Sequence, residues 1–310
     1  MALPICDWLH GLSHPVSAEL SSRAKTYLQN TGGFLSSREA EDHLVRLGLL
    51  PAVFPERLYQ GDAAAKVRAE LRGALPAATD ADLFLAPSGM NAVWAAFQAA
   101  SALQASRGRT VWLQLGWLYL DTIAILQRFT GGPENYVHLR DPLDLRAVEQ
   151  ALAAHGTRVA GVIAEVPTNP LIQTTDVPAL AALCRRQGAL LIVDPSIASV
   201  HHVDALPHAD LVVASLTKYT ASEGDLTAGL VAVNAAGRDA AALREQPELF
   251  ATVAQALVLD HYRSVQRRHS LRKKTNPDRL QIAFRPLVMP VVGGNQTHRS
   301  RLQPVVALPG

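Results

Sequence analysis

The sequence predicts an α/β protein built on a mostly parallel sheet that is buried on both faces. Between residues 80 and 234, short apolar runs alternate with Ala- and Leu-rich stretches of helical length. The apolar runs lack polar alternation, which is typical of parallel strands covered by helices on both sides. Two helical stretches end in glycine, a usual residue just past a helix C-terminus. The runs are DLFLA, TVWLQL, GVIAEV, ALLIVD and DLVVAS, and the helical stretches are NAVWAAFQAASALQA, LDLRAVEQALAAHG and VPALAALCRRQG.

Three regions of the chain differ in pattern. Residues 1–75 mix short helical stretches such as SREAEDHLVRLGLL with Gly and Pro breaks, and we expect an N-terminal arm with helices there. Residues 76–234 carry the periodic pattern and should form a large ligand-binding domain. Residues 235–310 continue through a helical and then a basic stretch into chain with no clear period. We expect a separate, partial C-terminal region there.

The composition is that of a globular protein. Of 310 residues, 48% are hydrophobic and 18% are charged, which suits a packed core and argues against a disordered chain. The net charge of +2 creates no overall field for nucleic acid or an anionic membrane. Two cysteines provide no disulfide framework. Neither a membrane-spanning run nor a secretory signal is recognisable. We therefore expect a soluble, cytoplasmic protein with no membrane or nucleic-acid partner.

Polar groups follow four of the predicted strands. Ligands of open parallel sheets bind beyond the carboxyl ends of the strands, so these groups should share one rim. Each group alone has a plain explanation as a helix cap, a turn residue or a solvated lysine. Together they complement a single ligand. They are Ser88, Gly89 and Met90 after DLFLAP, Glu165 and the following PTNP segment after GVIA, Asp194 after LLIV, and Ser215, Thr217 and Lys218 after LVVA.

The ligand that these groups fit is a pyridine ring carrying an aldehyde and a phosphate. The aldehyde needs a lysine for a Schiff base, and Lys218 follows a strand directly. A carboxylate such as Asp194 favours the protonated ring nitrogen, which makes the ring an electron sink. Tyr119, in WLYLDT, is placed to stack on the ring. The phosphate needs backbone N–H groups at a helix N-terminus, from Gly89 and Met90, and hydroxyls, from Ser215 and Thr217.

Four sequence blocks in order make the chain resemble the Cys/Met-metabolism family of pyridoxal-phosphate enzymes over roughly residues 55 to 234. The run from ALLIVDPSIAS to DLVVASLTKYTASEGD is similar to the family signature around its lysine. EVPTNPLIQTTD is similar to the acidic-Pro-x-Asn-Pro block, APSGMNA to the Ser-Gly-Met turn, and YLDT to Tyr-Gly-Gly-Thr. The stretch LQNTGGFLSSREAEDHL further resembles the fungal-type branch of cystathionine gamma-synthases.

The resemblance implies a fold type I transferase-like large domain, an incomplete small C-terminal domain, and a homo-oligomer, dimeric or tetrameric. Pyridoxal 5'-phosphate would be the cofactor and small amino acids the substrates. Lys218 would be the Schiff-base lysine, Asp194 the partner of the ring nitrogen, and Tyr119 the stacking side chain. Asn169 would bond the ring hydroxyl. The implied phosphate-site residues are Ser88, Gly89, Met90, Ser215 and Thr217, with Tyr59 from the family's Tyr-Gly-Arg block.

The reaction implied is γ-replacement on an activated homoserine by cysteine, which gives cystathionine. The freed amine of Lys218 would move protons between carbon and cofactor. Elimination at the γ- or β-carbon, as in a lyase, is an open alternative. So is a non-catalytic family member that acts through a full-length partner.

Several positions depart from the family pattern. Asp194-Pro195-Ser196-Ile197 replaces Asp-Asn-Thr-Phe, which keeps the carboxylate and changes the turn. Tyr59-Gln60-Gly61 lacks the arginine of Tyr-Gly-Arg, a loss of roughly 1.5–3 kcal/mol in phosphate binding unless Arg57 or Lys66 substitutes. No match to the block with the substrate-carboxylate arginine is found in residues 235–310, which predicts a truncated or frame-altered product. The remaining arginines there include Arg285, Arg299 and Arg301.

Other polar groups have weaker functional interpretations. His201, His202 and His208 lack thiolate companions, so we expect no metal site. The basic stretch from Arg263 to Lys274 lacks interleaved aromatic residues apart from Tyr262, so we interpret it as a solvated helix face rather than a nucleic-acid patch. Glu223 and Asp225 are interpreted as turn or capping residues.

Overall fold

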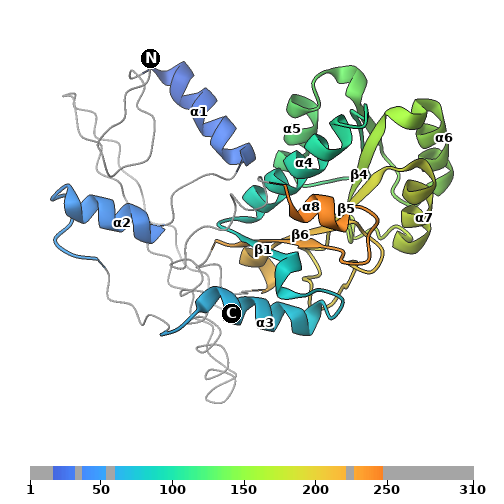
Figure 1. Cartoon of the computed structure of the whole chain (residues 1–310). Coiled ribbons are helices and arrows are strands. Elements are labelled where there is room, and N and C mark those ends of the chain that lie inside the picture. The colour runs from blue at the N-terminus through green and yellow to red at the C-terminus, as the bar shows by residue number, and fades with distance from the viewer. Residues whose placement is uncertain (1–16, 32–36, 54–59, 221–226, 247–310) are drawn as a thin grey trace, which may run out of the picture.

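A seven-stranded sheet with helices on both faces forms the centre of the chain. The computed structural model describes residues 17–31, 37–53, 60–220 and 227–246 (Figure 1). Within these residues the strands follow the order β1-β7-β6-β5-β4-β2-β3. The predicted α/β class with a mostly parallel sheet is therefore confirmed.

Six strands of the sheet run in one direction and β7 runs against them. β2, β3, β4, β5 and β6 pair in parallel, whereas β7 is antiparallel to both β6 and β1. Five strands coincide with the predicted apolar runs, and β3 and β7 are additional. The strands are β1 (Leu83–Ala86), β2 (Val111–Leu115), β3 (Tyr136–Leu139), β4 (Val159–Glu165), β5 (Leu190–Asp194), β6 (Leu211–Ser215) and β7 (Gly229–Val233).

Helices cover both faces of the sheet, as the unbroken apolar strands require. The side chains of α3, α6 and α7 join the hydrophobic core on one face, and those of α4, α5 and α8 join the core on the other. No helix in the described ranges is long and apolar enough to cross a membrane. The helices are α1 (Ala18–Thr31), α2 (Ser37–Arg46), α3 (Ala63–Ala74), α4 (Gly89–Ala105), α5 (Leu120–Phe129), α6 (Leu145–His155), α7 (Val177–Gln187) and α8 (Ala240–Arg244).

Local capping chemistry fixes the ends of the helices behind the sheet. The carboxylate of Asp144 accepts hydrogen bonds from the first turn of α6, and that of Asp176 does so for α7. Gly156 and Gly188 follow these two helices with φ of +55° and +69°, a backbone region that favours glycine. The predicted glycine ends of both helices are confirmed.

The N-terminal helix α1 packs on α5 through a buried amide. The side chain of Asn30 donates to Asp121 at 3.0 Å and accepts from Arg128 at 2.7 Å. The ring of Tyr27 meets that of Phe129 edge to face. These contacts attach α1 to the helix that begins just after Tyr119.

The predicted domain limits at residues 75 and 234 remain predictions. Val67 and Leu71 of α3 join the core that contains the sheet, so α3 packs with the large domain. Leu243 of α8 joins the opposite core, and Arg244 pairs with the buried carboxylate of Asp82 at 2.7 Å. Residues 247–310, including the basic stretch and the three late arginines, lie outside the described residues.

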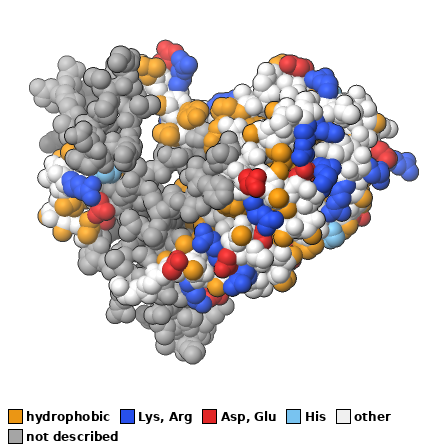
Figure 2. All heavy atoms as spheres, viewed as in Figure 1, with side chains coloured by type: hydrophobic (Ala, Val, Ile, Leu, Met, Phe, Trp, Pro, Cys, Tyr) orange, Lys and Arg blue, Asp and Glu red, His pale blue; other side chains and the backbone are white. Residues whose placement is uncertain are grey.

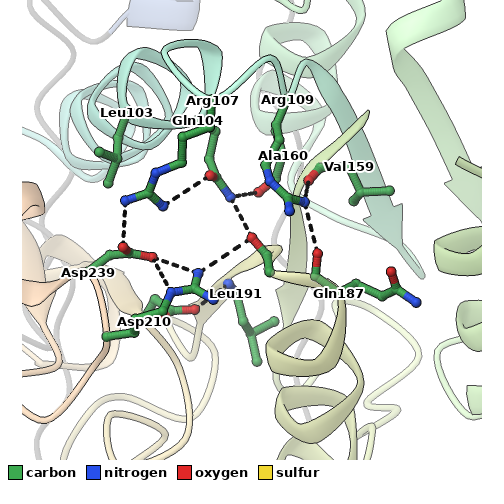
Figure 3. A network of polar contacts seen from close by, with 12 residues as sticks. Leu103, Gln104, Arg107, Arg109, Val159, Ala160, Gln187, Leu191, Asp210 and Asp239 are labelled. Carbon is green, nitrogen blue, oxygen red and sulfur yellow. Dashed lines mark hydrogen bonds and ion pairs between the residues drawn. The ribbon is translucent and has the colours of Figure 1, made fainter. Parts of the chain in front are cut away.

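The amino edge of the sheet carries a polar network in which Asp239 pairs with two arginines (Figure 3). Asp239, just before α8, is 5% exposed and accepts from Arg107 and Arg238, both at 2.7 Å. Burial opposes the charge on Asp239, but the two guanidinium groups outweigh it and lower the pKa of this carboxyl. Asp239 is therefore paired, whereas Asp210 at the same edge accepts from the N–H of Leu191 at 2.8 Å and has its pKa raised by burial.

The same network ties three elements together through backbone carbonyls (Figure 3). The amide of Gln104, at the end of α4, donates to the carbonyls of Ala160 and Gly188. The guanidinium of Arg109 donates to the carbonyls of Val159 and Gln187.

Figure 2 shows Lys and Arg side chains gathered around α6 and α7 in the same view. Of these helices, α7 carries Arg186, which pairs with Glu149 of α6 at 2.9 Å.

At the opposite edge, β7 passes very close to the turn between β1 and α4. A Cβ atom on Gly229 would collide with the carbonyl oxygen of Ser88 and lie 3.0 Å from the Cβ of Ala92. Backbone atoms at such a contact cannot rotate away as a flexible side chain can. Glycine at this position therefore allows the Ser88 turn to sit against β7.

We expect Gly229→Ala to lower the free energy of unfolding by about 1–3 kcal/mol, because the added methyl group overpacks this contact. Urea unfolding of the purified chain measures the change. Gly73→Ala, in α3 with open space around its Cβ position, is the matched control and should be neutral or stabilising by up to about 1 kcal/mol. Equal stabilities of Gly229→Ala and the wild type would contradict the close approach.

Candidate functional site

The carboxyl ends of the parallel strands meet at one edge of the sheet, as predicted. Glu165 and Asp194 end β4 and β5 and pair in register. Ser215, at the end of β6, pairs with Gly229, which in turn pairs with Ala86 at the end of β1. Two groups of strand ends, one from β4 and β5 and the other from β6 and β1, thus form the rim of the candidate site.

One side of this rim has the features of an anion site. Ser88 caps α4, its Oγ accepting from the N–H of Asn91 at 3.0 Å. A Cβ atom on Gly89 would lie 2.6 Å from the Cβ of Ser215, so the turn and the end of β6 touch. The N–H groups of Gly89 and Met90 lie in the first turn of α4, where helix geometry offers them no acceptor. The positive end of the helix and the nearby serine hydroxyl suit a phosphate.

The segment after β6 carries Thr217 and Lys218 in an irregular turn. Residues 216–220 form a π-helical turn in which Lys218 has non-helical dihedral angles, and the Lys218 side chain is exposed. The hydroxyl of Thr217 accepts from the N–H of Ala228 at 3.0 Å and donates to its carbonyl at 3.3 Å. Thr217 therefore links the turn to the start of β7, and its contact with a phosphate stays a prediction.

Asp194 lies partly buried at the centre of the rim. Its Oδ1 accepts from the N–H of Ser196 at 2.9 Å. Burial raises the pKa of Asp194, against hydrogen bonds from the side chain and backbone of Ser196. Among the described residues, no Lys or Arg forms an ion pair with this carboxylate. A cationic ring nitrogen would offset the burial, so the residues present fit the predicted ligand.

The departure at Pro195-Ser196 builds a direct link between the two ends of the site. The Oγ of Ser196 accepts from the backbone N–H of Ser215 at 2.7 Å. Ser196 thus bonds the predicted ring-nitrogen partner Asp194 on one side and the predicted phosphate residue Ser215 on the other. The altered turn keeps the carboxylate in place and holds it near the phosphate end.

Glu165 is a second carboxylate of the site, and its residue type and position alone predict no specific role for it. Burial raises its pKa to about 7, the neighbouring Asp194 adds to the shift, and N–H groups of Tyr119 and Asn169 oppose it. One carboxylate oxygen accepts from the backbone N–H of Tyr119. The other accepts from that of Asn169 at 3.4 Å. Two signals in the sequence mark Glu165, its position at a strand end and its place in the EVPTNP block.

Tyr119 and Asn169 stand on two loops above the strand ends. Tyr119 immediately precedes α5 and is 51% exposed, and Asn169 is exposed in the loop after β4. Partial burial and the carboxylate of Asp121 raise the pKa of Tyr119. Through Glu165, the structure brings the backbones of both residues beside Asp194.

Some predicted residues are placed elsewhere or not described. Tyr59, Arg57, Glu223 and Asp225 lie outside the described residues. Lys66 pairs with Glu70 one turn along α3.

Within the described ranges, no group of three or more His, Cys, Asp or Glu side chains could hold a metal ion. The buried thiol of Cys184 has its pKa raised to about 12 by burial, so it is unreactive.

The raised pKa of Glu165 predicts that the stability of the folded chain falls as the pH rises. Its pKa rises from 4.5 to about 7 on folding, so the stability that it contributes is present below pH 4.5 and is lost as the pH rises through 7. We expect the wild type to lose about 3 kcal/mol relative to Glu165→Gln between pH 4.5 and 8. Urea unfolding of both proteins across this range measures the difference. A constant difference would show that Glu165 titrates normally.

Comparison with known proteins agrees with this geometry. A sequence model of the family described as "Cys/Met metabolism PLP-dependent enzyme" matches residues 68–257. An L-2-amino-4-chloropent-4-enoate dechlorinase/desaturase from Streptantibioticus cattleyicolor is 43% identical over 73% of this chain and 45% of its own length. Cystathionine gamma-synthase from Neurospora crassa is 30% identical over 53% of this chain and 26% of its own length. The chain spans less than half the length of these curated relatives.

A solved structure confirms the fold. Cystathionine gamma-lyase from Lactobacillus plantarum, complexed with L-serine, superposes with a TM-score of 0.54 at 20% identity, over 71% of this chain and 57% of the other. The predicted transferase-like large domain is therefore present. The family itself is shown by the sequence match over residues 68–257. The chain belongs to the Cys/Met metabolism family of PLP-dependent enzymes, whose cofactor is pyridoxal 5'-phosphate.

Proposed function

We propose that this chain carries the cofactor-binding domain of an enzyme that removes a leaving group from the γ-carbon of a small amino acid. The observation that carries the proposal is one connected site: Asp194 is joined through Ser196 to Ser215, and Ser215 touches the Gly89 turn. A ring partner and an anion site linked on one rim fit a phosphorylated pyridine. The residues of the chain then have distinct roles.

Lys218 would hold the cofactor covalently and afterwards carry protons to and from substrate carbon atoms. Its exposed side chain on an irregular turn gives the amine freedom to reach those atoms. Asp194 would keep the ring nitrogen protonated, and Tyr119 and Asn169 would contact the ring. When bound, the cofactor accepts the electron pair released at the α-carbon. Ser88, Gly89, Met90 and Ser215 would bind the phosphate.

Two reactions at the γ-carbon are compatible with this site, and the more similar of the two relatives described above favours elimination. The relative that is 43% identical is named for a substrate with chlorine at carbon 4, the γ-carbon, and for dechlorination. The cystathionine gamma-synthase relative is 30% identical. It supports the second candidate, replacement of the γ-substituent of an activated homoserine by cysteine. Elimination and replacement both require the same cofactor-binding side chains of this chain.

Assembly as a homodimer or homotetramer is part of the proposal. Apolar side chains stand exposed on loops at the carboxyl edge, Trp117 at 46%, Leu171 at 65% and Tyr219 at 65%. A surface of this kind often marks a contact between subunits. Location in the cytoplasm rests on the composition alone and stays a prediction.

Covalent attachment at Lys218 is testable directly. After incubation with pyridoxal 5'-phosphate and borohydride reduction, we expect peptide mass spectrometry to find the cofactor on Lys218. Lys218→Ala should lose this attachment and the visible absorbance band of the bound cofactor. Lys25→Ala, on the exposed face of α1, is the control and should keep both. Attachment at another lysine in the wild type would refute the assignment.

The reaction is tested with two substrates on the cofactor-loaded chain. With L-2-amino-4-chloropent-4-enoate, elimination would release one chloride ion and one proton for each substrate consumed, measured by ion chromatography. With an O-acylhomoserine and cysteine, cystathionine formation would favour the second candidate. A loaded chain that turns over neither substrate would instead support a non-catalytic member that depends on a full-length partner.

A further inference from the structure

Glu165 occupies an unusual place for a charged side chain. It ends β4, is 7% exposed and lies between the buried residues Ala164 and Val166. Its partner across the sheet is Asp194. Two carboxylates side by side at a buried edge repel each other, and burial itself disfavours charge. An apolar or neutral side chain at this position would cost the fold less.

The hydrogen bonds of Glu165 indicate what the charged group does. Its two carboxylate oxygens accept from backbone N–H groups of two separate segments, one at Tyr119 after β2 and one at Asn169 after β4. A carboxylate offers acceptors on both oxygens, whereas an amide offers only one. The two donors lie 46 and 4 residues from Glu165 in the chain. The side chain therefore connects two loops, one after β2 and one after β4, that are far apart in the sequence.

We propose that Glu165 is a positioning residue whose carboxylate holds the backbones at Tyr119 and Asn169 together, so that both side chains meet the cofactor ring beside Asp194. This inference rests on the proposed function, because it takes Tyr119 and Asn169 as the ring contacts. It extends that function by naming the group that fixes their relative placement. A residue with only a structural role would affect folding and cofactor binding alike.

The decisive variant is Glu165→Gln, which keeps the size of the side chain and one acceptor oxygen. Its NH₂ group would face one of the two backbone N–H donors, so one of the bonds is lost. Glu165→Asp retains the charge on a shorter stem and provides a second test if the glutamine variant folds poorly. Glu149→Gln is the matched control, since Glu149 is exposed on α6 and pairs only with Arg186 among the described residues.

We expect Glu165→Gln to raise the dissociation constant for pyridoxal 5'-phosphate about tenfold, measured by visible absorbance titration. The circular dichroism of the bound cofactor should fall as the ring contacts loosen. The unfolding temperature of the cofactor-free protein should be unchanged or higher, because a buried charge is removed. Without cofactor, at least one of the backbone amides of Tyr119 and Asn169 should exchange hydrogen faster than in the wild type. Glu149→Gln should change none of these quantities.

Two outcomes would overturn the inference. One is a Glu165→Gln protein with wild-type cofactor affinity, circular dichroism and amide exchange at both Tyr119 and Asn169. The other is a loss of affinity matched by a fall in the unfolding temperature of the cofactor-free protein in both Glu165 variants, which would assign Glu165 to the fold alone. Failure of the proposed function is distinguishable, because the wild type itself would then lack attachment at Lys218, and the inference would fall with it.

Discussion

The burial of both faces of a parallel sheet is the constraint on which this structure depends. Helices cover the strands on each side, so acidic side chains lie at the two edges where strands begin and end. The two edges differ in how these carboxylates are paired. At the amino edge, two guanidinium groups lower the pKa of Asp239, and those of Arg185 and Arg238 oppose the rise that burial gives to the pKa of Asp210. At the carboxyl edge, Asp194 has no ion pair with a described Lys or Arg, and burial raises its pKa.

This difference gives the carboxyl edge its chemical character. A carboxylate that is desolvated without a protein cation is stabilised by a cationic ligand, and a protonated pyridine nitrogen is such a ligand. Ser196 connects this carboxylate to Ser215, which touches the glycine turn at the start of α4. The Pro-Ser segment that departs from the family sequence is therefore compatible with the family's cofactor. It replaces the usual turn with one that bonds both ends of the site.

Local sequence signals predicted the elements with strong periodicity and missed those defined by tertiary contacts. The apolar runs of β1, β2, β4, β5 and β6 were recognisable because strands buried on both faces have uniform composition. β3 is partly exposed and its YVHL sequence has no comparable run. The direction of β7 follows from its pairing between β6 and β1, which no local pattern records. Nor could the sequence show that the hydroxyl of Thr217 bonds Ala228.

The site was predictable to the extent that it lies at strand ends. The placement of Asp194, Ser215 and the Ser88–Gly89 turn on one rim followed from the parallel sheet. The role of Glu165 did not, because its acceptor contacts reach the backbone rather than recognisable side chains. A side chain that holds backbone N–H groups leaves no motif in the residues that it holds. The role of such a residue is recognised only from a structure, which shows the backbone N–H groups that its side chain contacts.

The most direct test of this account is a crystal structure of the chain loaded with pyridoxal 5'-phosphate. The account predicts continuous electron density from the cofactor to the Nζ of Lys218, the ring nitrogen within hydrogen-bond distance of the Asp194 carboxylate, and the phosphate at the start of α4 beside Ser215. A structure in which the Lys218 amine and the Asp194 carboxylate open into different cavities would contradict it.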